Sequence, residues 1–336
     1  MKAYQIKEGG VTMEDLVMVE LDKPSPGPGQ VLVRVRAASL NFRDLACVTG
    51  NYPGGAVKRD TIPLSDGAGE VVEIGAGVDR FSVGDRVAGT FFQVWVDGRP
   101  PPTIAALGNP LDGVLAEYIV LDQDGLVGIP DDLSMEEASC LPCAGLTAWN
   151  AITVSDRLKP GETVLLLGTG GVSIFALQFA RLCGARVIIT SSSDEKLERA
   201  MAMGADEGIN YRAKPEWDKA VLELTAGAGV DHVVEVGGMG TLAKSMSAVG
   251  FGGQVTLIGV LSGREGDTSP HGLMFKGARL QGIFVGSRVM FEGMNRAIAV
   301  NGIQPVVDRV FPFDEAHAAL GLMAEGGHFG KIVISV

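Results

Sequence analysis

Histidine and cysteine are scarce in this 336-residue chain, which has four residues of each. The histidines begin at His232, and Cys47 is the sole cysteine among the first 123 residues. Cys140-x-x-Cys143 has no second CxxC motif to complete a four-thiolate zinc site. The first 123 residues therefore lack a Cys/His zinc-ligand set, and the thiols are interpreted as buried or incidental.

The chain also lacks a long hydrophobic segment and an excess of basic residues. No apolar run approaches the roughly 20 residues of a membrane span, and the start MKAY has neither the apolar core nor the cleavage site of a signal peptide. Asp and Glu number 40 against 28 Lys and Arg, which gives a net charge of −12. This balance argues against nucleic acid or an anionic membrane as partner. We expect a cytoplasmic protein that binds small molecules.

A glycine-rich turn stands at the centre of the sequence. The apolar run Thr163–Leu167 ends in GTGGVS, and apolar residues then recur at helical spacing. Gly168 permits a sharp turn, whereas Gly170 and Gly171 leave room for a phosphate at the free N–H groups of the helix start. The pattern is GxGxxS, with Ser173 at the third glycine position, so it is weak alone and needs a βαβ context.

That context is present, because apolar strand-like runs alternate with helical stretches from residue 163 to residue 285. This alternation predicts an α/β fold with a doubly wound parallel sheet of the Rossmann kind. The strands are expected at 163–167, 186–190, 207–210, 231–236, 254–260 and 279–285, and helices at 193–203 and 241–249.

The first 123 residues have a different sequence pattern. Short alternating runs separated by Pro/Gly turns predict a partly open β-barrel. Near the C-terminus, 304–311 and 331–336 resemble these strands, whereas 288–300 and 314–324 are predicted helices. We therefore predict one domain from 1–123 plus 303–336, and a dinucleotide-binding domain from 124–302.

The order and spacing of several motifs give the chain a family resemblance over essentially its whole length. It resembles the zinc-independent branch of the medium-chain dehydrogenase/reductase superfamily, which includes quinone oxidoreductases and enoyl reductases. The resemblance implies a GroES-like catalytic domain, a Rossmann domain inserted into it, and a cleft between them for cofactor and substrate. The motifs are PGPGQVLVRV (26–35), SLNFRD (39–44), DGAGEVVEIGAGV (66–78), VGDRV (83–87), LPCAGLTAWNAI (141–152), GTGGVS (168–173), SSSDEKLERAMAMGAD (191–206) and GKIVISV (330–336).

The zinc enzymes of this superfamily take their catalytic ligands from positions that match Asn41, Ser65 and Cys143 here. Only one of these is a thiol, so we predict a metal-free enzyme. Carbonyl activation would then depend on hydrogen-bond donors and on exclusion of water, which favours quinones and conjugated carbonyls.

Asn41 and Tyr52 are the candidate catalytic residues. The Asn41 amide can donate or accept a hydrogen bond beside the nicotinamide or substrate, although bonding to its own loop is an equally good interpretation. Tyr52, before Pro53, matches the proton-donor tyrosine of the enoyl reductases; without the resemblance, it could simply cap a turn. Arg43 and Asp44 are interpreted as a structural ion pair or loop anchor.

The cofactor preference is predicted from the end of the second Rossmann strand. NAD-preferring domains place an acidic residue there, about 20 residues beyond the glycine turn; here the sequence reads Ser191-Ser192-Ser193. These hydroxyls and Lys196 can receive a 2′-phosphate, which indicates NADP, although SSSDEK is also a plain capped helix start. By family match Tyr211 contacts the same phosphate, and Lys331 lies near the position of a basic residue in some relatives. The remaining predicted cofactor contacts are Thr147, Gly168, Thr169, Gly170, Gly171, Val172, Val236, Gly237, Gly259, Val260, Leu261, Phe284 and Val285.

Taken together, these features predict an oxidoreductase that transfers hydride between NADPH and an activated carbonyl. Two alternatives remain open at this point: an alcohol/aldehyde dehydrogenase that uses the same cleft, and a non-catalytic NADPH-binding protein. A homodimer is expected, because the last Rossmann strand, 279–285, would otherwise leave an apolar sheet edge exposed.

Overall fold

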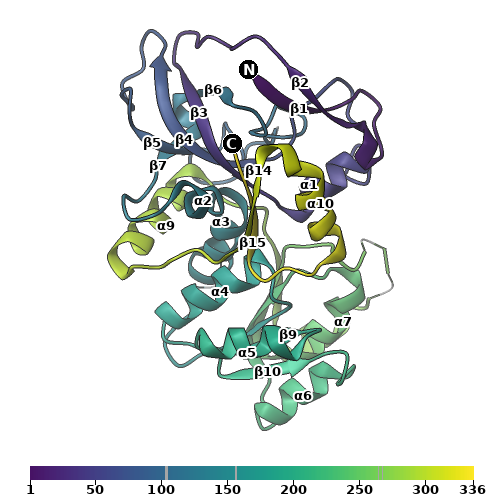
Figure 1. Ribbon diagram of the computed structural model, residues 1–336. Helices are drawn as coiled ribbons and strands as arrows, with labels where there is room; N and C mark the ends of the chain where they lie inside the picture. Colours follow the sequence, from purple (N-terminus) through teal and green to yellow (C-terminus); the bar gives the residue numbers. More distant parts are fainter. Residues whose placement is uncertain (103–104, 156, 264, 267) are drawn as a thin grey trace. The chain divides into compact units, whose positions relative to one another are not determined.

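The computed structural model describes residues 1–102, 105–155, 157–263, 265–266 and 268–336. The chain forms two compact units, coloured along the sequence in Figure 1: unit 1 comprises Met1–Leu146 and Val285–Val336, and unit 2 comprises Thr147–Phe284. These divisions differ from the predicted boundaries after residues 123 and 302. Helices α2 (Met135–Ser139) and α9 (Arg288–Asn301) pack against strands of unit 1, which places both with that unit.

Unit 2 is built on a six-stranded sheet of order β10-β9-β8-β11-β12-β13, in which every neighbouring pair is parallel. This order confirms the predicted doubly wound sheet, with its reversal of strand order between β8 and β11. Strand β12 begins earlier than predicted and ends at Leu257. The strands are β8 (Thr163–Leu166), β9 (Arg186–Ser191), β10 (Glu207–Asn210), β11 (Val230–Glu235), β12 (Val249–Leu257) and β13 (Arg279–Gly282).

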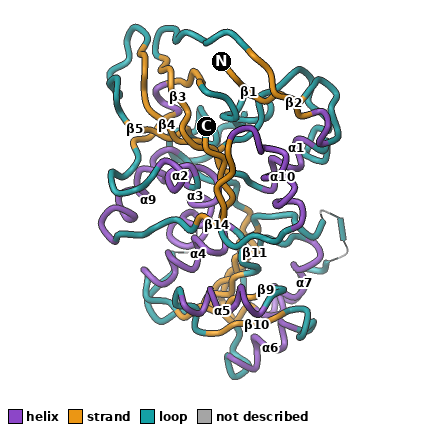
Figure 2. Tube along the Cα trace, viewed as in Figure 1, coloured by secondary structure: helices purple, strands orange, loops and turns teal. Residues whose placement is uncertain are grey.

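The helices of unit 2 cover this sheet, and α5 lies in front of β9 and β10 in Figures 1 and 2. Apolar residues of the central strands, such as Val164 and Val233, are fully buried because helices pack on them. The helices are α3 (Leu146–Trp149), a π-helical turn at Asn150–Ser155, α4 (Gly171–Leu182), α5 (Asp194–Ala202), α6 (Trp217–Leu224), α7 (Met239–Ala248) and α8 (His271–Lys276).

Unit 1 contains a seven-stranded sheet of order β14-β15-β3-β4-β5-β7, with β6 paired to β3, and a separate hairpin of β1 and β2. Its pairs are antiparallel except β14 with β15, and both chain termini lie in this unit. The strands are β1 (Lys2–Ile6), β2 (Leu16–Glu20), β3 (Gln30–Ser39), β4 (Asp66–Ile74), β5 (Arg86–Gly89), β6 (Tyr118–Asp122), β7 (Leu126–Gly128), β14 (Val307–Pro312) and β15 (Lys331–Ser335).

Four α-helices accompany this sheet: α1 (Phe42–Val48), α2, α9 and α10 (Ala316–Glu325). A π-helical turn at Leu141–Gly145 and 3₁₀ turns at Met13–Asp15, Gln123–Gly125 and Phe313–Glu315 complete the unit. None of the helices in the described ranges is both long and apolar enough to cross a membrane.

A half-buried contact joins Glu162, directly before β8, to His232 of β11. Glu162 Oε2 accepts a 2.8 Å hydrogen bond from the N–H of Lys159 and lies 3.0 Å from His232 Nε2. Burial raises the pKa of Glu162, but these contacts outweigh it and hold the pKa below its ordinary value. A carboxyl group with a lowered pKa stabilises the folded state above its unfolded pKa and loses this effect as the pH falls through the folded value.

We expect Glu162→Gln to destabilise the protein at pH 7 by on the order of 1 kcal/mol, and less as the pH falls below about 4. Thermal unfolding of both proteins across pH 3 to 7 measures the difference. Glu223→Gln, an exposed change on α6, is the control and leaves stability unchanged. A gap between wild type and Glu162→Gln that widens toward low pH would contradict the assignment.

Candidate functional site: the carboxyl edge of the parallel sheet and a buried charge cluster

The predicted cofactor residues of unit 2 come together because its strands are parallel. Loops that follow parallel strands meet at one edge of the sheet, the carboxyl edge, where α/β proteins bind nucleotides. The loops placed there are Gly168–Val172 after β8, Ser192 and Ser193 after β9, Tyr211 after β10, Val236 and Gly237 after β11, Gly259–Leu261 after β12, and Phe284 after β13.

The glycine turn has the geometry that the sequence predicts. Gly168 adopts φ 74°, and its N–H donates to Thr190 Oγ1 at 3.1 Å, which ties the turn to the next strand. Helix α4 begins at Gly171 with Gly170 as its N-cap, and no side chain caps its first N–H groups. A Cβ at Gly170 would meet nothing within 4 Å. The helix start is therefore open to a phosphate.

Ser173 occupies the third glycine position of the GxGxxG pattern, and the structure shows how a serine is accommodated there. The side chain is buried, and Oγ donates a 2.6 Å hydrogen bond to the carbonyl of Leu167, immediately after β8. The hydroxyl thus satisfies a backbone acceptor where helix and strand approach each other. The departure from GxGxxG preserves the turn.

Hydroxyl groups occupy the end of β9, where NAD-preferring domains carry an acid. Ser191 Oγ lies 3.3 Å from Thr169 Oγ1, and Ser193 Oγ accepts the N–H of Lys196 at the start of α5. The nearby carboxylate of Asp194 instead accepts a 2.7 Å hydrogen bond from Asn210. Tyr211, 40% exposed, follows β10.

A buried carboxylate that the sequence analysis did not identify organises the loops after β11 and β12. Glu235 is fully buried, and its Oε1 accepts hydrogen bonds from the N–H groups of Gly237 and Gly238 and from Thr241 Oγ1. A Cβ at Gly259 would lie 2.0 Å from the carbonyl oxygen of Val236, so only glycine fits there. Of the other predicted contacts, Thr147 and Val285 are buried, whereas Val260, Leu261 and Phe284 are exposed.

In unit 1, the two predicted catalytic residues flank helix α1. Asn41 is its N-cap, and the N–H of Asn41 donates to Asp44 Oδ2 at 2.8 Å. Tyr52 follows the helix, and its N–H donates to the carbonyl of Ala46. The sequence analysis did not predict this helix, although Asn41 and Asp44 have the spacing of a capping box.

Arg43 anchors the segment, as the sequence analysis predicts. Its guanidinium donates to Asp44 Oδ1 and to the carbonyls of Leu107 and Asn109, and it lies 4.8 Å from the centroid of the Tyr52 ring. The phenol is therefore held beside a rigid, buried cation.

Asp66 is the centre of a second set of buried contacts. It is fully buried at the start of β4, where Oδ1 accepts from Ser65 Oγ at 2.6 Å and Oδ2 accepts from the N–H of Cys143 at 2.8 Å. Asn41 lies beside the same carboxylate. Asp66 thus lies beside all three residues that match zinc ligands in the zinc enzymes, which are Asn41, Ser65 and Cys143.

Lys331 brings a second cation to this cluster from β15. It is 3% exposed, and Nζ donates to the carbonyl of Leu40 and, at 2.7 Å, to Asn41 Oδ1. The sequence analysis predicted Lys331 as a cofactor contact; the structure gives its ammonium two acceptors within unit 1. We call Asn41, Arg43, Asp44, Asp66 and Lys331 the buried charge cluster.

Burial dominates the titration of this cluster. It raises the pKa of Asp44 to about 6, against the opposing effect of Arg43, and raises the pKa of Asp66, against that of Lys331. Burial also raises the pKa of the Cys143 thiol, with Asp66 adding to the effect. The cluster holds two carboxyl groups and two basic side chains.

The donor set around Asp66 does not fit zinc. An amide, a hydroxyl and one protonated thiol replace the thiolates and imidazole that zinc prefers, and Asn41 Oδ1 already accepts from an ammonium. Within the described part of the chain, no three His, Cys, Asp or Glu side chains form a group that could hold a metal ion.

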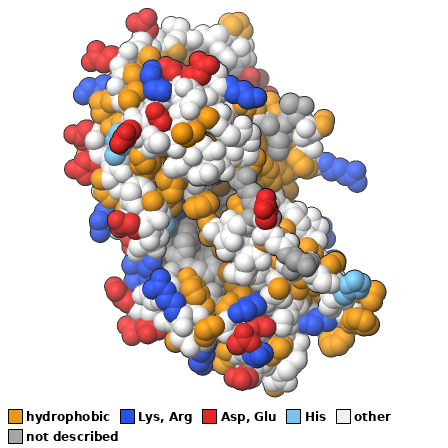
Figure 3. Space-filling model, turned by 90° about the vertical axis from the view of Figure 1, so that its right-hand side faces the viewer, with side chains coloured by type: hydrophobic (Ala, Val, Ile, Leu, Met, Phe, Trp, Pro, Cys, Tyr) orange, Lys and Arg blue, Asp and Glu red, His pale blue; other side chains and the backbone are white. Residues whose placement is uncertain are grey.

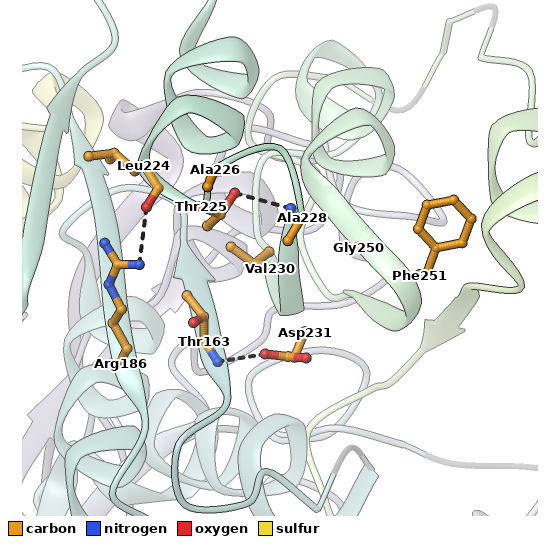
Figure 4. A pocket seen from close by; sticks show the side chains of 11 residues that line it. Thr163, Arg186, Leu224, Thr225, Ala226, Ala228, Val230, Asp231, Gly250 and Phe251 are labelled. Atoms are coloured by element: carbon orange, nitrogen blue, oxygen red, sulfur yellow. Dashed lines mark hydrogen bonds between the residues drawn. The ribbon is translucent and has the colours of Figure 1, made fainter.

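A hollow at the opposite end of the unit 2 sheet is a weaker candidate site. Figure 4 shows its lining, from the amino ends of β8, β9 and β11. Its polar groups are paired with each other or with backbone: Asp231 accepts from the N–H of Thr163, and Arg186 donates to the carbonyl of Leu224. Nothing in this lining calls for a ligand.

Comparison with known protein families matches both parts of the chain. A model described as "Alcohol dehydrogenase GroES-like domain" matches residues 27–131, and one described as "Zinc-binding dehydrogenase" matches residues 171–299. A zinc-type alcohol dehydrogenase-like protein of Schizosaccharomyces pombe is 44% identical over 319 residues, covering 92% of this chain and 91% of the relative. A quinone oxidoreductase of Pseudomonas aeruginosa is 37% identical over 239 residues, 71% of this chain and 67% of the relative.

Solved structures agree over the whole chain. One described as an NAD-dependent alcohol dehydrogenase has a TM-score of 0.92 and 34% identity, and covers 100% of both chains. A variant of the crotonyl-CoA carboxylase/reductase AntE, in complex with NADP, has a TM-score of 0.90 and 26% identity; the match covers 100% of this chain and 95% of that chain. These neighbours differ in the cofactor that their descriptions name.

Proposed function

The chain belongs to the medium-chain dehydrogenase/reductase superfamily of NAD(P)-dependent oxidoreductases, and we propose that it is an NADPH-dependent, zinc-free reductase of activated carbonyl compounds. The observation that carries the proposal is the composition of the buried charge cluster, where Lys331 and hydrogen-bonding groups stand in place of a zinc-ligand set. The quinone oxidoreductase and carboxylase/reductase relatives are consistent with it.

NADPH would be held by the carboxyl edge of unit 2. The pyrophosphate fits the open start of α4, which supplies N–H groups and the positive end of the helix dipole. Ser192, Lys196 and Tyr211 are proposed to receive the 2′-phosphate. When bound, the cofactor supplies hydride.

The residues of unit 1 act on the acceptor. The Nδ2 group of Asn41 would donate a hydrogen bond to the carbonyl oxygen, where negative charge develops as hydride adds to a conjugated carbon. Tyr52, whose ring lies against Arg43, or water supplies the proton to the resulting enolate. Quinones, enones and enoyl compounds meet these requirements, because conjugation already makes the accepting carbon electrophilic.

We expect the purified protein to oxidise NADPH with quinones, enones or enoyl thioesters, and Tyr52→Phe to lower kcat roughly 100-fold with little change in NADPH binding. A spectrophotometric assay at 340 nm measures both. Tyr118→Phe, a change on β6, is the matched control and retains activity.

Two results of this assay would contradict the proposal, and a third would decide between its two proton sources. Oxidation of alcohols at alkaline pH without reduction of conjugated acceptors would identify the alcohol dehydrogenase alternative. Tight NADPH binding without consumption would identify a binding protein. Equal kcat for wild type and Tyr52→Phe would leave water as the proton source.

Cofactor choice is tested on α5. Lys196→Gln is expected to weaken NADPH binding roughly 10-fold by removing a charged partner of the 2′-phosphate, while NADH binding stays unchanged. Titrations that follow nicotinamide fluorescence give both dissociation constants. Lys219→Gln, on α6, is the control; an equal loss for NADPH and NADH in Lys196→Gln would oppose a phosphate contact.

We also propose that the protein forms a homodimer through the free edge of β13. Among the described residues this strand has one neighbour, β12, and Leu280 is 40% exposed on it; Met274 and Phe275 of the preceding helix are more exposed still. Figure 3 shows hydrophobic side chains gathered beside a histidine at its lower right. Unpaired strand edges with apolar neighbours favour pairing with a second copy.

Light scattering coupled to gel filtration should give the mass of two chains for the wild type and of one for Leu280→Asp, because a buried charge on each protomer opposes pairing. Val300→Asp, at an 84% exposed position on α9, is the control and stays dimeric. A monomeric wild type, or a dimeric Leu280→Asp, argues against this interface.

A further inference from the structure

The side-chain amide of Asn41 has an orientation that its neighbours decide. An amide can present either its oxygen or its NH₂ group to a partner, and the two ends are distinguished by what the partner can do. The ammonium of Lys331 only donates hydrogen bonds, so the end that faces it at 2.7 Å is Oδ1. The NH₂ group is thereby turned away from Lys331.

The NH₂ group of Asn41 has no hydrogen-bond partner among the described residues although it is buried. It lies on the side of Asp66, whose pKa the Asn41 side chain lowers, but makes no hydrogen bond of normal geometry with that carboxylate. A buried donor without an acceptor destabilises the protein, because it has lost its hydrogen bonds to water and gained none in return. Such a group is well suited to an acceptor that arrives with the substrate.

Lys331 is itself held in place. It is the first residue of β15, whose strand pairs with the end of β3 next to Leu40, and its second hydrogen bond goes to the carbonyl of Leu40. The ammonium therefore spans the backbone and the side chain of two consecutive residues, Leu40 and Asn41. The positive charge of Lys331 also lowers the pKa of Asp44 and of Asp66, against the larger effect of their burial.

We propose that Lys331 is a positioning residue: its ammonium holds Oδ1 of Asn41 so that the NH₂ group is presented to the carbonyl oxygen of the acceptor. This inference rests on the proposed reductase function. It gives Lys331 a role different from a contact with the cofactor, since both acceptors of its ammonium belong to unit 1.

The test compares Lys331→Met and Lys331→Arg with wild type. Lys276→Met is the matched control, because Nζ of Lys276 also donates to backbone carbonyls, those of Met246, Ser247 and Val249. For each protein we would measure NADPH affinity by fluorescence and the kcat and KM for a conjugated acceptor. We would also record the side-chain amide resonance of Asn41 in ¹⁵N spectra, assigned with Asn41→Asp.

We expect Lys331→Met to lower kcat at least about 10-fold, less than the full effect of deleting an oxyanion donor, with NADPH affinity unchanged within a factor of about two. Its Asn41 amide resonance should move. Lys331→Arg keeps the charge and should recover part of kcat, whereas Lys276→Met should leave kcat and the resonance unchanged. If Lys331→Met does not fold, the shifted resonance and partial loss of kcat in Lys331→Arg still test the assignment.

Loss of NADPH affinity with unchanged kcat at saturating cofactor would overturn the inference in favour of a cofactor contact. An unchanged kcat and affinity would overturn it as well. A wild type that binds NADPH but reduces no acceptor would contradict the proposed function. The positioning role of Lys331 is then tested by the Asn41 amide resonance alone, and a resonance that does not move in either Lys331 variant would overturn that role.

Discussion

Burial of charge in unit 1 is the constraint on which the candidate site depends. Asp44 and Asp66 are both shielded from solvent, and a buried carboxylate without compensation costs several kcal/mol. Arg43 and Lys331 provide this compensation from opposite ends of the sequence, one on α1 and one on β15. The geometry of the segment around α1 therefore depends on β15, because Lys331 hydrogen-bonds to both Leu40 and Asn41.

Unit 2 meets a different requirement, which is to gather backbone N–H groups and hydroxyls at one edge. Parallel strand order does this without charged side chains at the glycine turn, and Glu235 fixes the neighbouring loop by accepting hydrogen bonds from the N–H groups of Gly237 and Gly238. Because Asp194 bonds to Asn210, the end of β9 presents hydroxyls in place of a carboxylate. An acidic protein of net charge −12 can thus still offer a phosphate a favourable local environment.

Much of the fold could be predicted from the sequence, because apolar runs and glycine turns are local signals. The positions of the Rossmann strands along the chain and the turn at Gly168 follow from such signals. The candidate site could be predicted only in part. Asn41 and Tyr52 were recognised through family motifs, whereas the contact between Lys331 and Asn41 joins residues 290 positions apart and has no local signature. Glu235 escaped notice for another reason: a carboxylate that ends a buried strand looks like an ordinary surface residue until its donors are known.

The chemistry of the acceptor follows from what the cluster can offer. A resident zinc ion would stabilise developing negative charge by several kcal/mol as a Lewis acid, while a single neutral donor such as the Asn41 amide contributes about 3–4 kcal/mol at most. The difference has to come from the substrate. In a quinone or an enone, conjugation spreads the incoming charge onto a distant oxygen, so one oriented donor and one proton source suffice. Oxidation of a simple alcohol requires removal of a hydroxyl proton, and the carboxyl groups of the cluster already have partners: Asp44 pairs with Arg43, and Asp66 accepts from Ser65 Oγ and the N–H of Cys143. From the composition of the buried charge cluster we therefore propose reduction of conjugated carbonyls in preference to alcohol oxidation.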